Sequence, residues 1–192
     1  MFNDLSSLAA YLATRRSGRP RDLAAPGPDA AQLARILAMA MRTPDHGKLH
    51  PWRFVHVPHD RRDAFAATLE AAYRAGKPDA GRLEMEAAHR FAHQAPELVV
   101  LLSSPAESHK IPLWEQELSC GAVAMNLLHA AAALGFAGGW VTGWAAYSNQ
   151  VLAALGGRTG ERIAGFFFIG TPGAELEERP RPDYDEVVSV WR

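Results

Sequence analysis

Apolar positions three and four residues apart predict helices in six segments of the chain. In the segment 30–42, Leu33 and Ile36 fall on one face, and Asp29 stands where its side chain can cap the first turn. Pro44 then prevents the helix from continuing. The six helices expected from this spacing cover residues 5–16, 30–42, 60–76, 80–93, 113–135 and 148–155.

Short runs of β-branched and aromatic residues predict strands between these helices. Leu98–Leu102 and Ile163–Gly170 are continuous apolar runs, which is typical of interior strands covered on both faces. Phe54–Val57 predicts a short strand, Trp140–Trp144 a strand or turn, and Val187–Trp191 a terminal strand. Because helices separate most of the strands and no internal repeat occurs, we expect an α+β fold or a three-layer arrangement around a mixed sheet.

The segment 113–135 has the longest helical pattern in the chain, and its middle is small or apolar on nearly all sides. We therefore expect this helix to be buried on nearly all sides. The run 121–140 is rich in Ala and Gly rather than Leu, and Asn126 and His129 interrupt it. A membrane-spanning helix needs about 20 strongly apolar residues. The pattern favours a buried helix over a membrane span.

Composition excludes several classes of partner. The chain has 192 residues, which suits a single domain over 1–192, and its formal net charge of -1 provides no basic field to attract nucleic acid or an anionic membrane surface. Cys120 is the single cysteine, which fits a reducing compartment, and its place in the apolar helix indicates core packing. Met1–Leu5 contains an acid where a signal peptide carries basic charge. We expect a cytoplasmic location.

Residues 42–54 gather charged and aromatic side chains in a segment that also contains two prolines and a glycine. Those residues exclude a regular helix or strand over its length, and binding groups are frequent on loops that a rigid scaffold positions. Arg42 and His46 can both donate hydrogen bonds to the oxygens of a polar ring or a ribityl chain. We interpret the segment as one wall of a pocket for a flat, anionic ligand.

A second cationic group, Arg15-Arg16-Ser17, follows the first expected helix. Arginine forks match phosphate oxygens, and the serine hydroxyl adds a donor. Basic residues at the end of a helix also simply offset the helix dipole, which by itself would explain both arginines. Together these segments offer donors for a phosphate, donors for a polar chain and one wall of a pocket for a flat ring. FMN contains these three parts.

Asp45, His46 and His50 form an alternative constellation that resembles a metal site, and they keep a metal-dependent hydrolase open as a second function. Histidines four apart bind one metal most readily from one face of a helix, and Gly47 and Pro51 argue against a helix here. The sequence has no GxGxxG after a strand, no P-loop and no GxSxG.

Four segments together resemble the FMN-dependent nitroreductase family, and in particular its small YdjA-like branch. The resemblance extends from about residue 5 to residue 172, in the same order and with similar spacing. The segments that carry it are RRS at 15–17, MRTPDHGKLHPW at 41–52, HKIPLWEQE at 109–117 and GFAGGW at 135–140.

The resemblance implies an α+β, nitroreductase-like fold: a mixed, mostly antiparallel sheet surrounded by helices, in a homodimer with two FMN sites at the interface. It implies FMN contacts from one subunit through Arg15, Arg16, Ser17, Arg42 and His46, and from the other through Trp140, Val141 and Thr142. The branch can carry a basic side chain where this chain has Val141, so only backbone contact is implied there. In the family, arms like residues 172–192 embrace the partner subunit.

The resemblance also implies the chemistry. NADH or NADPH gives hydride to flavin N5, and a small-molecule acceptor such as a nitroaromatic or quinone then takes the electrons. No side chain is needed as an acid or base catalyst, because the flavin performs the chemistry. The segment Ala130, Ala131, Ala132, Ala133, Leu134 and Gly135 matches one associated with nicotinamide nucleotide binding, although a buried helix is its plain interpretation. A flavin-binding module without turnover remains a further alternative.

Overall fold

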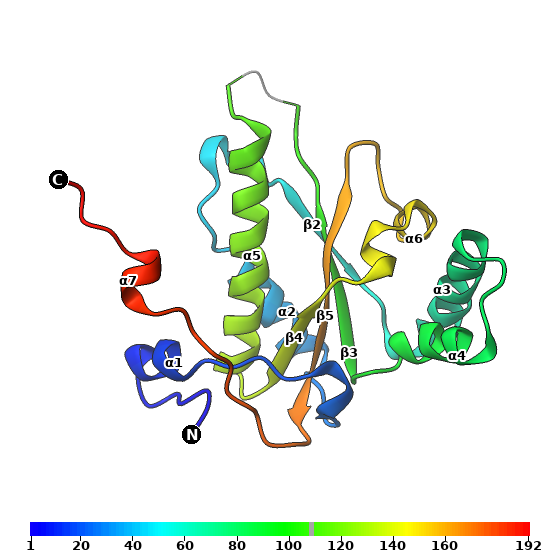
Figure 1. The fold of residues 1–192 in the computed structure, drawn as a ribbon, viewed down its shortest axis with the longest axis horizontal. Helices are drawn as coiled ribbons and strands as arrows, with labels where there is room; N and C mark the ends of the chain where they lie inside the picture. The colour runs from blue at the N-terminus through cyan, green and yellow to red at the C-terminus, as the bar shows by residue number, and fades with distance from the viewer. Residues whose placement is uncertain (108–109) are drawn as a thin grey trace. The chain divides into compact units, whose positions relative to one another are not determined.

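The structure is a computed structural model that describes residues 1–107 and 110–192 (Figure 1). His109, the first residue of the HKIPLWEQE segment, lies outside the described residues. The chain divides into two compact units. Residues 1–16 and 175–192 form the terminal unit, and residues 17–174 form the main unit.

The helices largely follow the apolar spacing in the sequence. Ser7 caps α1 and Asp29 caps α2 through their side chains, as the position of Asp29 predicted. Each predicted helix is present with slightly shorter bounds. In the described residues the helices are α1 Leu8–Thr14, α2 Ala30–Ala40, α3 Arg62–Gly76, α4 Arg82–Phe91, α5 Leu113–Ala133, α6 Asn149–Ala154 and α7 Tyr184–Val187, with 3-10 turns η1 Pro20–Asp22, η2 His46–Lys48, η3 His59–Arg61 and η4 Trp144–Tyr147.

A five-stranded sheet forms the centre of the main unit, and every pairing in it is antiparallel. Strand β5 pairs with β3 along one edge and with β4 and β1 along the other, and β2 pairs with the far edge of β3. The predicted α+β class with a mostly antiparallel sheet is confirmed. The strands are β1 Leu23–Ala24, β2 Trp52–His56, β3 Glu97–Ser103, β4 Ala137–Val141 and β5 Arg162–Pro172.

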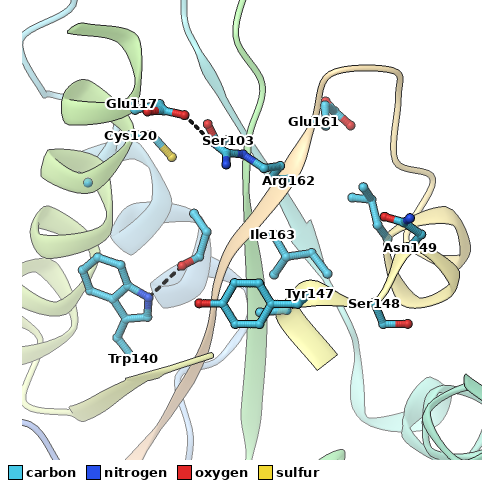
Figure 2. Close-up of a pocket in the computed structure, with 14 residues that line it drawn as sticks. Ser103, Glu117, Cys120, Trp140, Tyr147, Ser148, Asn149, Glu161, Arg162 and Ile163 are labelled. Atoms are coloured by element: carbon cyan, nitrogen blue, oxygen red, sulfur yellow. Dashed lines mark hydrogen bonds and ion pairs between the residues drawn. The ribbon is translucent and has the colours of Figure 1, made fainter. Parts of the chain in front are cut away.

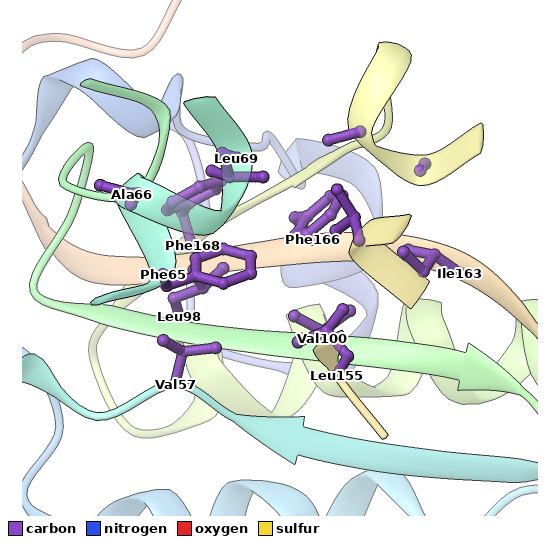
Figure 3. Close-up of a cluster of buried hydrophobic side chains, with 14 of the residues drawn as sticks. Val57, Phe65, Ala66, Leu69, Leu98, Val100, Leu155, Ile163, Phe166 and Phe168 are labelled. Atoms are coloured by element: carbon purple, nitrogen blue, oxygen red, sulfur yellow. The ribbon is translucent and has the colours of Figure 1, made fainter. Parts of the chain in front are cut away.

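Two hydrophobic cores lie on opposite faces of this sheet. Along β5, Phe166 and Phe168 belong to the core with α3 and α6, whereas Phe167 and Ile169 belong to the core with α2 and α5. Figure 3 shows the first core, where α3 side chains including Leu69 pack over Phe166 and Phe168. Helices therefore cover both faces, which explains why β3 and β5 are apolar at consecutive positions rather than at alternate ones.

Three expectations from the sequence are wrong in detail. The terminal strand Val187–Trp191 is absent: α7 begins at a capping box between Asp183 and Glu186, and Trp191 is 96% exposed. The strand or turn expected at Trp140–Trp144 is a strand that starts earlier, at Ala137, because Gly138 and Gly139 pair with β5. Helix α5 is not buried on nearly all sides.

The exposed face of α5 carries large apolar side chains. Trp114 is 67% exposed and Leu118 is 53% exposed. Within the described part of the chain, no helix combines the length and the apolar character that crossing a membrane requires.

Candidate functional site

The segment that follows α2 is fastened along one face of α5. The hydroxyl Oγ of Ser119 donates to the carbonyl of Pro44 over 2.6 Å, and the Asn126 amide Nδ2 donates to Thr43 Oγ1 over 2.6 Å. Nearer the start of α5, His46 Nδ1 lies 2.6 Å from Glu115 Oε2. These contacts fix the backbone that carries Arg42 and His46.

Sequence reasoning missed the polar residues that hold this loop, although a signal was present. Glu115, Ser119 and Asn126 are spaced by four and seven residues, so they form one stripe along α5. When only the apolar residues of this segment are considered, Asn126 is a polar interruption of an apolar run. A polar stripe on an otherwise apolar helix indicates that a polar segment packs against it.

Asp45 shapes the turn that follows. Its carboxylate accepts from the backbone N–H groups of Leu49, at 3.1 Å, and His50, at 2.9 Å. Gly47 adopts a φ of 80°, in the left-handed region that favours glycine. Asp45 therefore acts as a loop cap here, and the backbone donors occupy both of its oxygens.

The same geometry argues against the alternative metal site. The carboxylate of Glu115 holds Nδ1 of His46, and His50 Nε2 lies 4.0 Å from Asp45 Oδ2. Asp45, His46 and His50 do not form a set of three converging ligand atoms in the described part of the chain. The residues that would carry the metal-dependent hydrolase are not arranged for it.

Ser17 lies near β4 because its neighbour Gly18 makes a backbone hydrogen bond to that strand. The Gly18 N–H donates to the carbonyl of Gly138 over 3.0 Å. A Cβ at Gly139 would stand 2.6 Å from the Gly18 carbonyl oxygen, so the close approach of the two segments requires glycine at position 139. Gly138 and Gly139 of the GFAGGW segment thus bring Ser17 close to the strand that carries Trp140.

Trp140 sits on the edge of a cavity of about 390 Å³ in the main unit (Figure 2). Its indole Nε1 donates to the carbonyl of Ala164 over 3.0 Å, its ring stacks on Phe167 at 5.4 Å, and the side chain remains 40% exposed. Figure 2 shows side chains converging on this space from α5, β4, β5 and η4, among them Cys120 and Tyr147.

Charged groups in the cavity wall are paired. Arg162 pairs with Glu117, and Glu161 accepts from Arg53 Nη2 at 2.7 Å. Burial raises the pKa of the Cys120 thiol to about 11, so the nucleophilic thiolate is scarce at neutral pH. This agrees with the interpretation of Cys120 as a packing residue.

The contacts place the predicted cofactor residues of the main unit on different faces of α5. The loop with Arg42 and His46 lies on the Ser119 and Asn126 face. Trp140 instead shares its cavity with Cys120 and Gly121 of the roughly opposite face. Val141 and Thr142, which follow Trp140 at the end of β4, are half-buried.

Arg15 and Arg16 belong to the terminal unit. Arg16 is only 9% exposed at its side chain; its Nε donates to the carbonyl of Glu177 over 2.6 Å and lies 3.6 Å from Glu178 Oε1. Burial lowers the pKa of the Arg16 guanidinium, and the nearby positive charges include Arg179 and Arg181. Arg16 and Arg181 both pair with the Glu178 carboxylate. Guanidinium groups are donors that match phosphate oxygens as well as carboxylate oxygens.

The segment expected to bind a nicotinamide nucleotide is mostly interior. Ala130, Ala131 and Ala132 are buried at the end of α5, whereas Ala133 and Gly135 are exposed. Gly135 has a φ of 86° and turns the chain from α5 toward β4. Only the second half of this segment presents surface to a ligand in one copy of the chain.

Comparisons with known proteins agree on one family. A family model described as "Nitroreductase family" matches residues 12–171. YdjA of Escherichia coli strain K12, provisionally named as an NAD(P)H nitroreductase, is 38% identical over 151 residues, which cover 78% of this chain and 81% of that protein.

Solved structures share the fold. A nitroreductase-like family protein from Bacillus cereus has a TM-score of 0.81 at 20% identity, covering 100% of this chain and 99% of that one. A mutant of NfnB, an FMN and NADPH-dependent nitroreductase from Sphigopyxis sp. strain HMH, has a TM-score of 0.73 at 25% identity, covering 96% and 98%.

Proposed function

The chain belongs to the nitroreductase family, and from this we propose that it is an FMN-dependent NAD(P)H oxidoreductase. The observation that carries the proposal is the family match over residues 12–171, which includes each cofactor-binding residue inferred from the sequence. When bound, FMN supplies the N5 position that takes hydride from NADH or NADPH and passes electrons to an acceptor such as a nitroaromatic or a quinone.

The protein's own residues bind and orient the cofactor. We assign the phosphate to Arg15, Arg16 and Ser17, because guanidinium and hydroxyl donors match its oxygens. Arg42 and His46, on the loop fastened to α5, donate to the polar part of the ring system. Trp140, Val141 and Thr142 contact the flavin from the other subunit, Val141 through its backbone alone. Ala130–Gly135 remains the proposed contact for the nicotinamide nucleotide.

A homodimer that shares its two sites between subunits is part of this proposal. It is supported by the exposed apolar side chains Trp114 and Leu118 on α5, and by the placement of Arg42 and Trp140 toward opposite faces of that helix. A second copy would cover the apolar face and could bring its own Trp140 toward the loop with Arg42. We further propose a single functional domain, an arm at 172–192 that contacts the partner, and a cytoplasmic location.

Anaerobic titration of the purified protein with NADH and NADPH tests the function. We expect a yellow protein that releases FMN on denaturation and whose flavin absorbance bleaches on adding at least one of the two nucleotides. Reoxidation by a nitroaromatic or a quinone should restore the colour. A colourless, chelator-sensitive enzyme would indicate the hydrolase instead, and a flavin that neither nucleotide reduces would indicate the binding module.

Arg42→Ala should weaken FMN retention about 10- to 150-fold, because a charge-assisted hydrogen bond contributes about 1.5–3 kcal/mol. Equilibrium dialysis of the apoprotein against FMN measures this directly. Arg35→Ala is the matched control, since Arg35 is an exposed arginine of the neighbouring helix α2. Equal FMN affinity in the two variants would remove Arg42 from the site.

A further inference from the structure

Two histidines and two carboxylates meet on the α3–α4 hairpin, and none of the four residues is assigned to the cofactor. Asp63 and Glu70 are seven residues apart on α3, which places both on one face. His89 lies in α4, and His93 lies in the turn after it; their rings stack at 5.2 Å. One potential ligand atom from each of Asp63, His89 and His93 lies within 4.8 Å of the others.

The distances suit a borderline divalent metal. His93 Nε2 and Asp63 Oδ1 lie 3.3 Å apart. Two ligand atoms on one tetrahedral zinc ion, each about 2.0–2.1 Å from it, are separated by about 3.3 Å. All three residues are exposed, so a metal ion and its water ligands can reach them from solvent. Two imidazoles and one carboxylate form a ligand set that binds Zn²⁺ in preference to Mg²⁺ or Ca²⁺.

Glu70 supplies the support that such a site needs. Its Oε1 lies 2.7 Å from His89 Nδ1. A carboxylate at that position holds the proton on Nδ1 and leaves the lone pair of Nε2 for a metal, as metal-binding histidines in general require. Glu70 would thus act as a positioning residue for His89.

The surroundings keep the ligands in place and limit repulsion. Tyr73 donates to Glu84 over 3.0 Å, which ties α3 to α4 near their connecting turn. Arg82 and Arg90 lie on the same helix as His89, and both pair with Glu86. Their charges are therefore partly neutralised next to the site.

We propose that Asp63, His89 and His93 bind one Zn²⁺ ion, or another divalent metal that prefers imidazole ligands. The bound ion joins α3 to α4. Water completes the coordination. The site is structural, because the proposed cofactor residues lie elsewhere in the chain. It is independent of the flavin chemistry proposed above, so either proposal can fail without the other.

Isothermal titration of the purified full-length protein with Zn²⁺, after treatment with EDTA and buffer exchange, tests the site. We expect one ion per chain in the wild type and at least a tenfold loss of affinity in His89→Gln and in His93→Gln. His59→Gln is the matched control, because His59 is an exposed histidine just before α3 and outside the ligand group. It should bind as the wild type does.

Two further measurements make the result decisive. Co²⁺ should give visible absorption bands with the intensity of tetrahedral coordination, and the His93→Gln substitution should abolish them. Glu70→Gln should keep those bands while lowering the affinity for the metal about 10- to 100-fold. Zn²⁺ should also raise the melting temperature of the wild type but not of His89→Gln. Stoichiometric binding that survives in His89→Gln and in His93→Gln would overturn the proposal. Wild-type binding no stronger than that of a variant carrying both substitutions would overturn it as well.

Discussion

Arg62→Ala should lower the free energy of unfolding by about 3–5 kcal/mol, the largest effect that we expect from a single substitution in this chain. Arg62 is 2% exposed, although it opens α3 next to the surface. Its Nε donates to Val57 O over 2.7 Å, and its Nη1 donates to Ala92 O over 2.7 Å. Longer hydrogen bonds run from Nη1 to the carbonyl of Ala95 and from Nη2 to the carbonyl of Pro96.

These bonds join three separate parts of the chain: the end of β2, the end of α4 and the approach to β3. Alanine would leave the carbonyl groups buried without a donor and would open a cavity. Burial lowers the pKa of the Arg62 guanidinium, but an arginine still remains charged at neutral pH. The energetic importance of Arg62 therefore lies in its donors.

Urea unfolding followed by circular dichroism measures this loss. Arg61→Ala is the control, because Arg61 is exposed and the neighbouring backbone contact from Arg61 N to Pro58 O is independent of its side chain. We expect the control to stay within about 0.5 kcal/mol of the wild type. Arg62→Lys should recover only part of the loss, since one ammonium cannot replace the planar fork. A fully stable Arg62→Ala protein would contradict this role.

Glu161→Gln should lower the free energy of unfolding at pH 7 by about 3 kcal/mol at most. The Glu161 side chain is 3% exposed and accepts from Arg53 Nε at 3.1 Å and Nη2 at 2.7 Å. Ser104 Oγ and the backbone N–H of Arg158 donate to it as well. The Arg53 guanidinium, with these two donors, lowers the pKa of Glu161 from 4.5 to about 2.

The pH dependence follows from the direction of this shift. A carboxylate whose pKa is lower in the folded state stabilises the protein fully above the unfolded pKa of 4.5, and that contribution is lost as the pH falls toward 2. The stability difference between wild type and Glu161→Gln should therefore be constant above about pH 5.5 and should shrink below pH 4.5. Urea unfolding of both proteins across this range provides the measurement.

Glu86→Gln is the matched control for this series. Glu86 is 40% exposed at its side chain and pairs with Arg82 and Arg90 on the surface of α4. Exposed pairs of this kind contribute about 0–1 kcal/mol, so the variant should differ little from the wild type at any pH. A Glu161→Gln protein with the same pH profile as the wild type would show that Glu161 is not held as a buried anion.

Local pattern and composition determined a large part of this protein from the sequence by itself. Helix spacing, the Asp29 cap and the apolar runs of β3 and β5 predicted elements that the structure confirms, because these signals act over a few residues. The four segments that resemble the nitroreductase family suffice to identify it. Their order along the chain carries that information independently of how the segments pack.

Only the tertiary structure decided features whose partners are distant in sequence. The start of β4 depends on pairing with β5, and the Glu161 carboxylate is buried because Arg53 reaches it from 108 residues away. The same holds for the meeting of Asp63 with His93, which are 30 residues apart. Hydrogen bonds and ion pairs of this kind form only after the chain has brought their groups together, so no local pattern encodes them.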